Sequence, residues 1–216
     1  MRSVSRLMYG MPMDAYAAID IPAISVLNDA VGGVQVTVLE DLSSRDPELA
    51  KGNVVTLKGN QATTYVRSRD FNALDANNLR MQRQRQYVTA FIRKAMAKAR
   101  QNISIVLTLY QAVQAYMSTD IDVARLTYLV SLALQREFTD ANIMNVAGEV
   151  VKGQKFTEYH VDEKALYELI LKIYYNEVDD NGNIVIPEAM TEETEIEEPQ
   201  EEESEKIITI DRDVLI

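Results

Sequence analysis

The spacing of apolar residues divides the first part of the chain into short elements. Alternation predicts a strand at Tyr16–Ile19, and a short helix begins at Pro22, since proline suits the first turn of a helix. Gly32–Gly33 end that helix, and a second alternating strand follows at Val34–Leu39. We interpret this stretch as a β-α-β unit. A polar linker over Asp41–Asn53 leads into a brief strand and a helical turn, VVTLKGNQATTYVRSR.

The longest apolar pattern begins at Asn77. The next two dozen residues contain neither glycine nor proline, and their apolar members recur at helical spacing: Leu79, Val88, Phe91, Ile92, Ala95 and Ala99. Two further helices are predicted over Ile105–Met117 and Val123–Phe138. Two strands joined by a turn at Gly153 follow, and Asp162 is expected to cap a last helix.

Strands and helices interleave throughout, which predicts an α/β fold: a mixed β-sheet sandwiched between helices. We expect residues 1–180 to form this domain. After residues 181–183 the pattern stops, and AMTEETEIEEPQEEESE has no periodicity and little apolar content. Residues 181–216 are therefore predicted to be a disordered acidic tail. Its last residues, IITIDRDVLI, could form a short strand or an attachment motif.

Charge is distributed unevenly. The chain of 216 residues has 22 Lys and Arg against 33 Asp and Glu, a net charge of −11. Ten glutamates and no basic residue lie between Glu188 and Glu205, so the rest of the chain carries only about −1. This near-neutral body with an acidic tail argues against a nucleic-acid partner.

Several classes of site are excluded by composition. The chain has no cysteine, so disulfide scaffolds, thiolate metal sites and cysteine nucleophiles are absent. His160 is the only histidine, which excludes a zinc site of two or three imidazoles, and we interpret it as a surface or strand residue. No apolar run reaches the length of a membrane helix, and no signal peptide follows Met1. Either the protein stays in the cytoplasm, or Met1 is not the biological start.

Candidate chemistry concentrates between Tyr65 and Arg100. Nine basic residues face two aspartates there, a local net charge of about +7. Arg67 and Arg69 flank a serine, and Arg80 and Gln84 share one helix face at i, i+4. Guanidinium groups bind phosphate oxygens bidentately, and a helix N-terminus also favours an anion. The pattern is typical of a pyrophosphate socket, although a solvated face paired with nearby acids is the alternative.

The same residues resemble a known family. YVRSRDFNALDANNLRMQRQRQYVTAFIRK is similar to the signature of the LytR-CpsA-Psr (LCP) family: an aromatic-Val-Arg-x-Arg, a loop with an aspartate, then Arg-x-x-Arg-Gln opening a long helix. DAVGGVQVTV, LKGNQATTYVR and FTEYHVDEKALYELILKIYYNEV resemble further family segments in the same order. The resemblance covers roughly residues 8–178 and implies an LCP-like α/β/α fold.

The resemblance implies an extracytoplasmic phosphotransferase of the Gram-positive cell membrane and wall. Such enzymes attach glycopolymers of the teichoic acid or capsule type, carried on polyprenyl pyrophosphate, to peptidoglycan. Implied partners are the lipid-linked polymer, peptidoglycan and, through the lipid, the membrane surface. The alternative is a non-catalytic module that binds polyprenyl phosphate or regulates. A DNA-binding regulator is a third, weaker hypothesis.

The resemblance also assigns roles to residues. Arg67 and Arg69 would be catalytic, and a set of five would bind the pyrophosphate: Arg67, Arg69, Arg80, Arg83 and Gln84. Arg83 and Asp75 would support the loop and the helix start. The family implies Mg²⁺, but the family's membrane helix and metal-binding aspartates have no counterpart in this sequence. We therefore expect a fragment or a truncated homologue.

Overall fold

The computed structural model describes residues 2–69, 76–153, 157–178 and 207–210. The chain divides into two compact units, residues 1–143 and residues 144–216. The first unit contains α1 (Arg2–Leu7), β1 (Ala17–Ile19), α2 (Pro22–Ala30), β2 (Val34–Thr37), β3 (Val54–Leu57), α3 (Asn60–Arg67), α4 (Ala76–Gln101), α5 (Ile105–Val113), β4 (Met117–Thr119) and α6 (Val123–Ala133). Short 3-10 turns lie at Pro47–Leu49, Gln114–Tyr116 and Asp140–Asn142.

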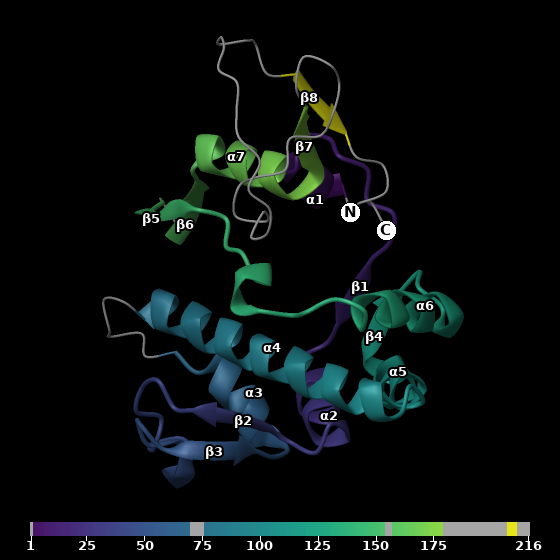
Figure 1. Cartoon of the computed structure of the whole chain (residues 1–216). Coiled ribbons are helices and arrows are strands. Elements are labelled where there is room, and N and C mark those ends of the chain that lie inside the picture. The colour runs from purple at the N-terminus through teal and green to yellow at the C-terminus, as the bar shows by residue number, and fades with distance from the viewer. Residues whose placement is uncertain (1, 70–75, 154–156, 179–206, 211–216) are drawn as a thin grey trace, which may run out of the picture. The chain divides into compact units, whose positions relative to one another are not determined.

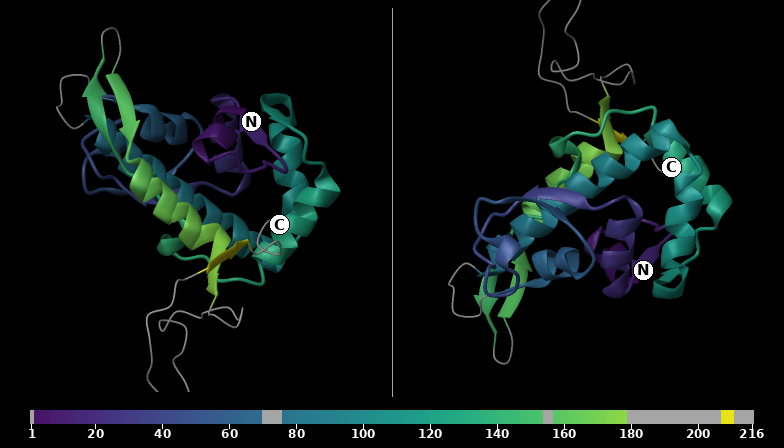
Figure 2. Two further views of the ribbon diagram at one scale, coloured as in Figure 1. Left: turned by 90° about the horizontal axis from the view of Figure 1, so that it is seen from above. Right: turned by 90° about the horizontal axis from the view of Figure 1, so that it is seen from below.

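The long helix α4 organises the first unit. In Figure 1, α3 and the β2–β3 hairpin lie along its N-terminal half, and α5 and α6 lie at its C-terminal end. Figure 2 gives the same arrangement from above and below. The core lies between these elements and consists of Val31, Val34, Val36, Val38, Leu42, Leu49, Leu57, Ala62, Tyr65, Val66 and Tyr87. The predicted amphipathic helix is therefore confirmed, and it covers the core with one face.

A glycine turn fixes how α2 meets the β2–β3 hairpin. Gly32 and Gly33 have φ of 80° and 78°. A Cβ on Gly33 would lie 2.7 Å from the backbone oxygen of Leu57, so this approach needs glycine. The buried Asn28 completes the junction, because its amide donates to Leu57 O at 2.8 Å and its oxygen accepts from Val34 N at 3.0 Å.

The predicted single mixed sheet is not found in the described residues. They form four two-stranded antiparallel sheets: β1–β4, β2–β3, β5–β6 and β7–β8. β1 pairs with β4, Ala17 opposite Thr119, rather than with β2 in a β-α-β unit. The short strands β2 and β3 pair with each other through a hairpin instead, so the β-α-β interpretation was wrong.

Helix ends also differ from those predicted. The helix predicted over Ile105–Met117 ends at Val113, because Met117–Thr119 pairs with β1 as β4. The helix predicted over Val123–Phe138 ends at Ala133, and the residues after it form turns. None of the described helices combines the length and apolar character that crossing a membrane requires.

The second unit contains β5 (Gly148–Lys152), β6 (Thr157–Val161), α7 (Glu163–Tyr174), β7 (Tyr175–Val178) and β8 (Ile207–Ile210). The hairpin around Gly153 and the cap at Asp162 are as predicted: the Asp162 carboxylate accepts from Ala165 N at 3.0 Å. His160 is an exposed β6 residue beside Glu158. Most of the predicted disordered tail, residues 179–206 and 211–216, lies outside the described residues, and Ile207–Ile210 between them forms the strand β8.

Candidate functional site

Most of the predicted site residues come from the end of α3 and the first turns of α4. Arg67 is the last residue of α3, and Ser68 leaves the helix with an extended backbone while its N–H still donates to Thr64 O. Arg67 is exposed, and Arg69 and Arg80 are half-buried. Asp75, predicted to support the loop, lies outside the described residues. The structure therefore brings the two arginine motifs to one junction of two helices.

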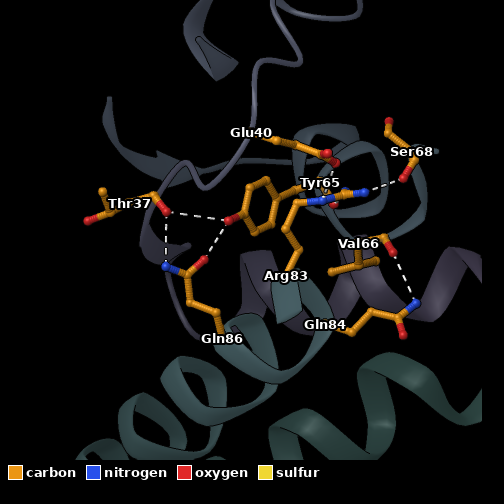
Figure 3. Close-up of polar contacts among 8 residues, drawn as sticks. All are labelled: Thr37, Glu40, Tyr65, Val66, Ser68, Arg83, Gln84 and Gln86. Carbon is orange, nitrogen blue, oxygen red and sulfur yellow. Dashed lines mark hydrogen bonds and ion pairs between the residues drawn. The ribbon is translucent and has the colours of Figure 1, made fainter. Parts of the chain in front are cut away.

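Arg83 lies beneath this junction, with its side chain fully buried. Its Nε lies 2.7 Å from a carboxylate oxygen of Glu40, and its two terminal nitrogens donate to the carbonyl oxygens of Tyr65 and Ser68 (Figure 3). The guanidinium carbon is 5.7 Å from the centre of the Tyr65 ring. Burial lowers the pKa of Arg83, and Glu40 opposes that shift.

These contacts give Arg83 a supporting position. Arg83 donates hydrogen bonds to two carbonyl groups at the end of α3 and pairs with Glu40, in the loop after β2. It therefore connects the end of α3 to that loop. Arg67 and Arg69 stand on either side of the Ser68 that it holds, so Arg83 fixes the backbone from which both project. Because its side chain has no exposed surface, we interpret Arg83 as a positioning residue and not as a phosphate ligand.

Gln84 and Arg67 both contribute to the lining of one cavity. The Gln84 amide donates to Val66 O at 3.1 Å (Figure 3), and both Gln84 and Arg67 line the same cavity. We call this the first cavity. It has a volume of about 520 Å³. Its remaining lining is apolar or aromatic: Ile19, Ile21, Ile24, Leu27, Val66, Tyr87, Val88 and Phe91. One amide and one guanidinium thus stand on the wall of an apolar chamber.

A second polar network borders Arg83. The Tyr65 hydroxyl donates to the Gln86 side-chain oxygen, and the Gln86 amide donates to Thr37 O at 2.9 Å (Figure 3). Tyr65 is fully buried, and its burial raises the pKa of the phenol to about 12, so the hydroxyl stays a donor. Glu40, Thr37 and Gln86 were missed by sequence reasoning. A carboxylate directly after an alternating strand was the one available signal for Glu40.

Four further cations of α4 contact oxygen atoms of the protein itself. Arg93 pairs with Asp140 at 2.9 Å, and Arg85 donates to the backbone oxygen of the same aspartate. Lys94 donates to the carbonyl oxygens of Gly32 and Gly33, and Arg100 to that of Arg136 at 3.4 Å. One of these cations pairs with an acid and the other three donate to backbone carbonyls, so the net charge of about +7 does not belong to one anion site.

Tyr87 contributes a buried hydroxyl to the region beside the first cavity. The side chain is 7% exposed, its ring stacks on Phe91 at 6.3 Å, and no described residue makes a hydrogen bond to its hydroxyl. Burial raises the pKa of this phenol, with a smaller contribution from Asp29, so it stays neutral.

Because burying an unpaired hydroxyl costs free energy, Tyr87→Phe should leave the free energy of unfolding unchanged or raise it by up to about 1 kcal/mol. Urea unfolding monitored by circular dichroism measures this. Tyr65→Phe is the matched control, since it removes a hydroxyl that donates to Gln86, and it should be destabilising. A loss of more than about 1 kcal/mol in Tyr87→Phe would mean that this hydroxyl has a partner.

The described residues do not fit a metal ion. No group of three or more His, Asp or Glu side chains among them is placed to hold one.

The fold and the site define a mixed α/β protein in which Arg67 and Gln84 line an otherwise apolar cavity. Residues 1–173 match the LytR_cpsA_psr family, and the chain therefore belongs to the LytR-CpsA-Psr family. No curated protein matches the chain.

Solved structures share the fold. A Listeria innocua protein is 24% identical over 79% of this chain and 70% of that chain, with a TM-score of 0.56. TagV of B. subtilis is 21% identical over 78% of this chain and 65% of its own, with a TM-score of 0.58. A structure of TagT bound to LI-WTA is 16% identical over 79% of this chain and 63% of its own, with a TM-score of 0.58. At these identities the similarity shows the fold alone.

Proposed function

We propose that this chain binds the pyrophosphate head of a polyprenyl-linked glycopolymer at Arg67, Arg69, Arg80 and Gln84, and that its activity is transfer of the polymer to peptidoglycan at the outer face of the membrane. The polymer is of the teichoic acid or capsule type. Residues 1–180 are the proposed catalytic domain, as the sequence predicts. Family membership supports the class of activity. TagT, which shares the fold, has been captured with a lipid-linked wall teichoic acid precursor.

The lining of the first cavity supports this function: the Arg67 guanidinium and the Gln84 amide lie in the wall of an otherwise apolar cavity. A polyprenyl pyrophosphate has the same division, because a doubly charged head is joined to a hydrocarbon tail. Arg67 and Gln84 stand where the head would lie, and Ile24, Leu27 and Phe91 are among the apolar residues available to the tail. Burial of the tail supplies affinity in proportion to the apolar area removed from water, and the guanidinium groups supply recognition of the phosphates.

The chemistry required of these residues is positioning and charge neutralisation. A peptidoglycan hydroxyl would form a P–O bond to the phosphorus that carries the polymer. The bond from that phosphorus to the bridging oxygen would break, polyprenyl phosphate would leave, and the hydroxyl proton would pass to a base. Arg67 and Arg69 would stabilise the negative charge that grows on the departing phosphate. Arg83 would hold the backbone that carries them.

Ligand-induced stabilisation tests the binding step. Farnesyl pyrophosphate should raise the melting temperature of the full chain, and Arg67→Ala combined with Arg69→Ala should weaken binding by about 100-fold or more, since each charged hydrogen bond contributes roughly 1.5–3 kcal/mol. Arg93→Ala combined with Arg100→Ala is the matched control, because it removes two α4 cations that lie outside the mouth. An equal loss in both double variants would point to nonspecific charge attraction and refute the site.

Turnover separates the enzyme from the non-catalytic binding module. The full chain is supplied with Mg²⁺, a lipid-linked glycan and a peptidoglycan acceptor, and phosphodiester formation is followed by mass spectrometry. Product that disappears in the Arg67 and Arg69 double variant supports the phosphotransferase. Farnesyl pyrophosphate binding without product supports the module.

A further inference from the structure

An acidic residue lies next to the cationic junction of α3 and α4. Glu40 follows β2 in the chain, and its carboxylate lies 2.7 Å from Arg83 Nε (Figure 3). The Glu40 side chain is 19% exposed and that of Arg83 is fully buried, so water and salt screen this ion pair only weakly. In the part of the chain that the structure describes, no other acid lies at ion-pair distance from Arg83.

The two terminal nitrogens of Arg83 are directed at the end of α3. They donate to the carbonyl oxygens of Tyr65 and Ser68. Ser68 is the residue between Arg67 and Arg69, and successive Cα atoms are about 3.8 Å apart, so a shift of Ser68 moves both arginines. A carboxylate held against Nε therefore fixes the direction in which the guanidinium presents its other donors.

Arg83 depends on this carboxylate for its buried position. Burial lowers the pKa of Arg83, Glu40 raises it, and the positive charge of Arg80 lowers it again. Without Glu40, the guanidinium would be a buried cation with only carbonyl acceptors and a second cation nearby. An uncompensated buried charge is strongly unfavourable, so Arg83 would turn toward water and release the end of α3.

We propose that Glu40 is a positioning residue for the anion site: acting through Arg83, it places Arg67 and Arg69 and so strengthens the binding of an anion. This inference rests on the proposed function and deepens it by adding a residue that touches no ligand. Positioning and simple electrostatics predict opposite results. By Coulomb's law, removing a negative charge near the site should strengthen anion binding, whereas a displaced pair of arginines should weaken it.

Glu40→Gln tests the proposal because it removes the charge and keeps the shape of the side chain. Binding of farnesyl pyrophosphate to the full chain, measured by isothermal titration calorimetry below its critical micelle concentration, should weaken by about 3- to 30-fold. Each variant is measured well below its own melting temperature, so that all of them are folded.

Glu48→Gln is the matched control. It makes the same change in the same loop, but Glu48 is exposed and pairs with none of the described cations. Its binding of farnesyl pyrophosphate should stay within about twofold of wild type or become tighter. The two variants have the same net charge, so any difference between them reflects where the carboxylate lies.

Two combined variants separate positioning from loss of stability. Glu40→Leu with Arg83→Leu should be more stable than Arg83→Leu alone, yet bind no better than Glu40→Gln, because the donors to α3 are missing. In a chain that already carries Arg67→Ala and Arg69→Ala, Glu40→Gln should have no further effect on binding.

Glu40→Gln that binds as tightly as wild type, or more tightly, would overturn the positioning role. So would a weakening by Glu40→Gln that persists in the Arg67 and Arg69 double variant. In both cases the proposed head-group site would stand, provided that the double variant itself binds weakly. A wild type that does not bind farnesyl pyrophosphate, or binding that the double variant leaves unchanged, would instead overturn the proposed function.

Discussion

Arg83→Leu should lower the free energy of unfolding by about 3–5 kcal/mol, one of the two largest effects expected for a single substitution in this chain. The substitution leaves the Glu40 carboxylate, whose side chain is only 19% exposed, without its cation. It also removes the donors to the carbonyl oxygens of Tyr65 and Ser68 at the end of α3. Chemical denaturation monitored by circular dichroism measures the loss.

Arg93→Leu is the matched control for this prediction. It removes the same side chain from the same helix, but Arg93 and Asp140 are 52% and 69% exposed, so solvent screens their attraction. The control should cost less than about 1 kcal/mol. Combining Arg83→Leu with Glu40→Leu should recover part of the loss, because no unpaired buried charge remains. Equal destabilisation by Arg83→Leu and Arg93→Leu would contradict the role of burial.

Gly33→Ala should cost about 2–5 kcal/mol through two separate effects. The positive φ of 78° is unfavourable for any residue with a Cβ. The new methyl carbon would also lie 2.7 Å from Leu57 O and 2.8 Å from the Thr56 methyl group, in the β3 strand that packs against the turn. Thermal and urea unfolding of the variant test this expectation.

The variant Gly32→Ala separates the backbone effect of a positive φ from the steric effect of the new methyl group. Gly32 has a φ of 80°, but no described atom lies within 4 Å of a Cβ built on it. Gly32→Ala should therefore show the backbone effect alone, about 1–2 kcal/mol. If both variants lost the same stability, close approach to β3 would not be what requires glycine at position 33.

Local patterns predicted the long helix α4 better than they predicted the sheets. Helical periodicity placed Arg80 and Gln84 on one face of α4, and the structure has Gln84 lining the first cavity with Arg67. Periodicity could not find Glu40, because its partnership with Arg83 joins residues 43 positions apart and exists only after folding. The head-group roles of Arg67, Arg69, Arg80 and Gln84 stay predictions.

Strand pairing failed for a related physical reason. A strand's own residues indicate that it is extended but not which neighbour it joins. Met117 continues the apolar pattern of α5, so the predicted helix ran up to it. Hydrogen bonds to Ala17–Ile19 instead make Met117–Thr119 a strand. Tertiary pairing thus overrode the local pattern at Met117–Thr119 and replaced the expected β-α-β unit.

The β1–β4 ladder also sets an order of events during protein synthesis. Ala17 pairs with Thr119, about a hundred residues later in the chain. At roughly 5–20 residues per second, the ribosome releases the partner of β1 some 5–20 s after β1 itself. β1 therefore stays without its partner strand while the residues of α2, the β2–β3 hairpin, α3 and α4 are synthesised. Among the four described strand pairs, this one has the largest separation along the chain, so β1 has the longest interval in which a chaperone that binds exposed apolar strands could capture it.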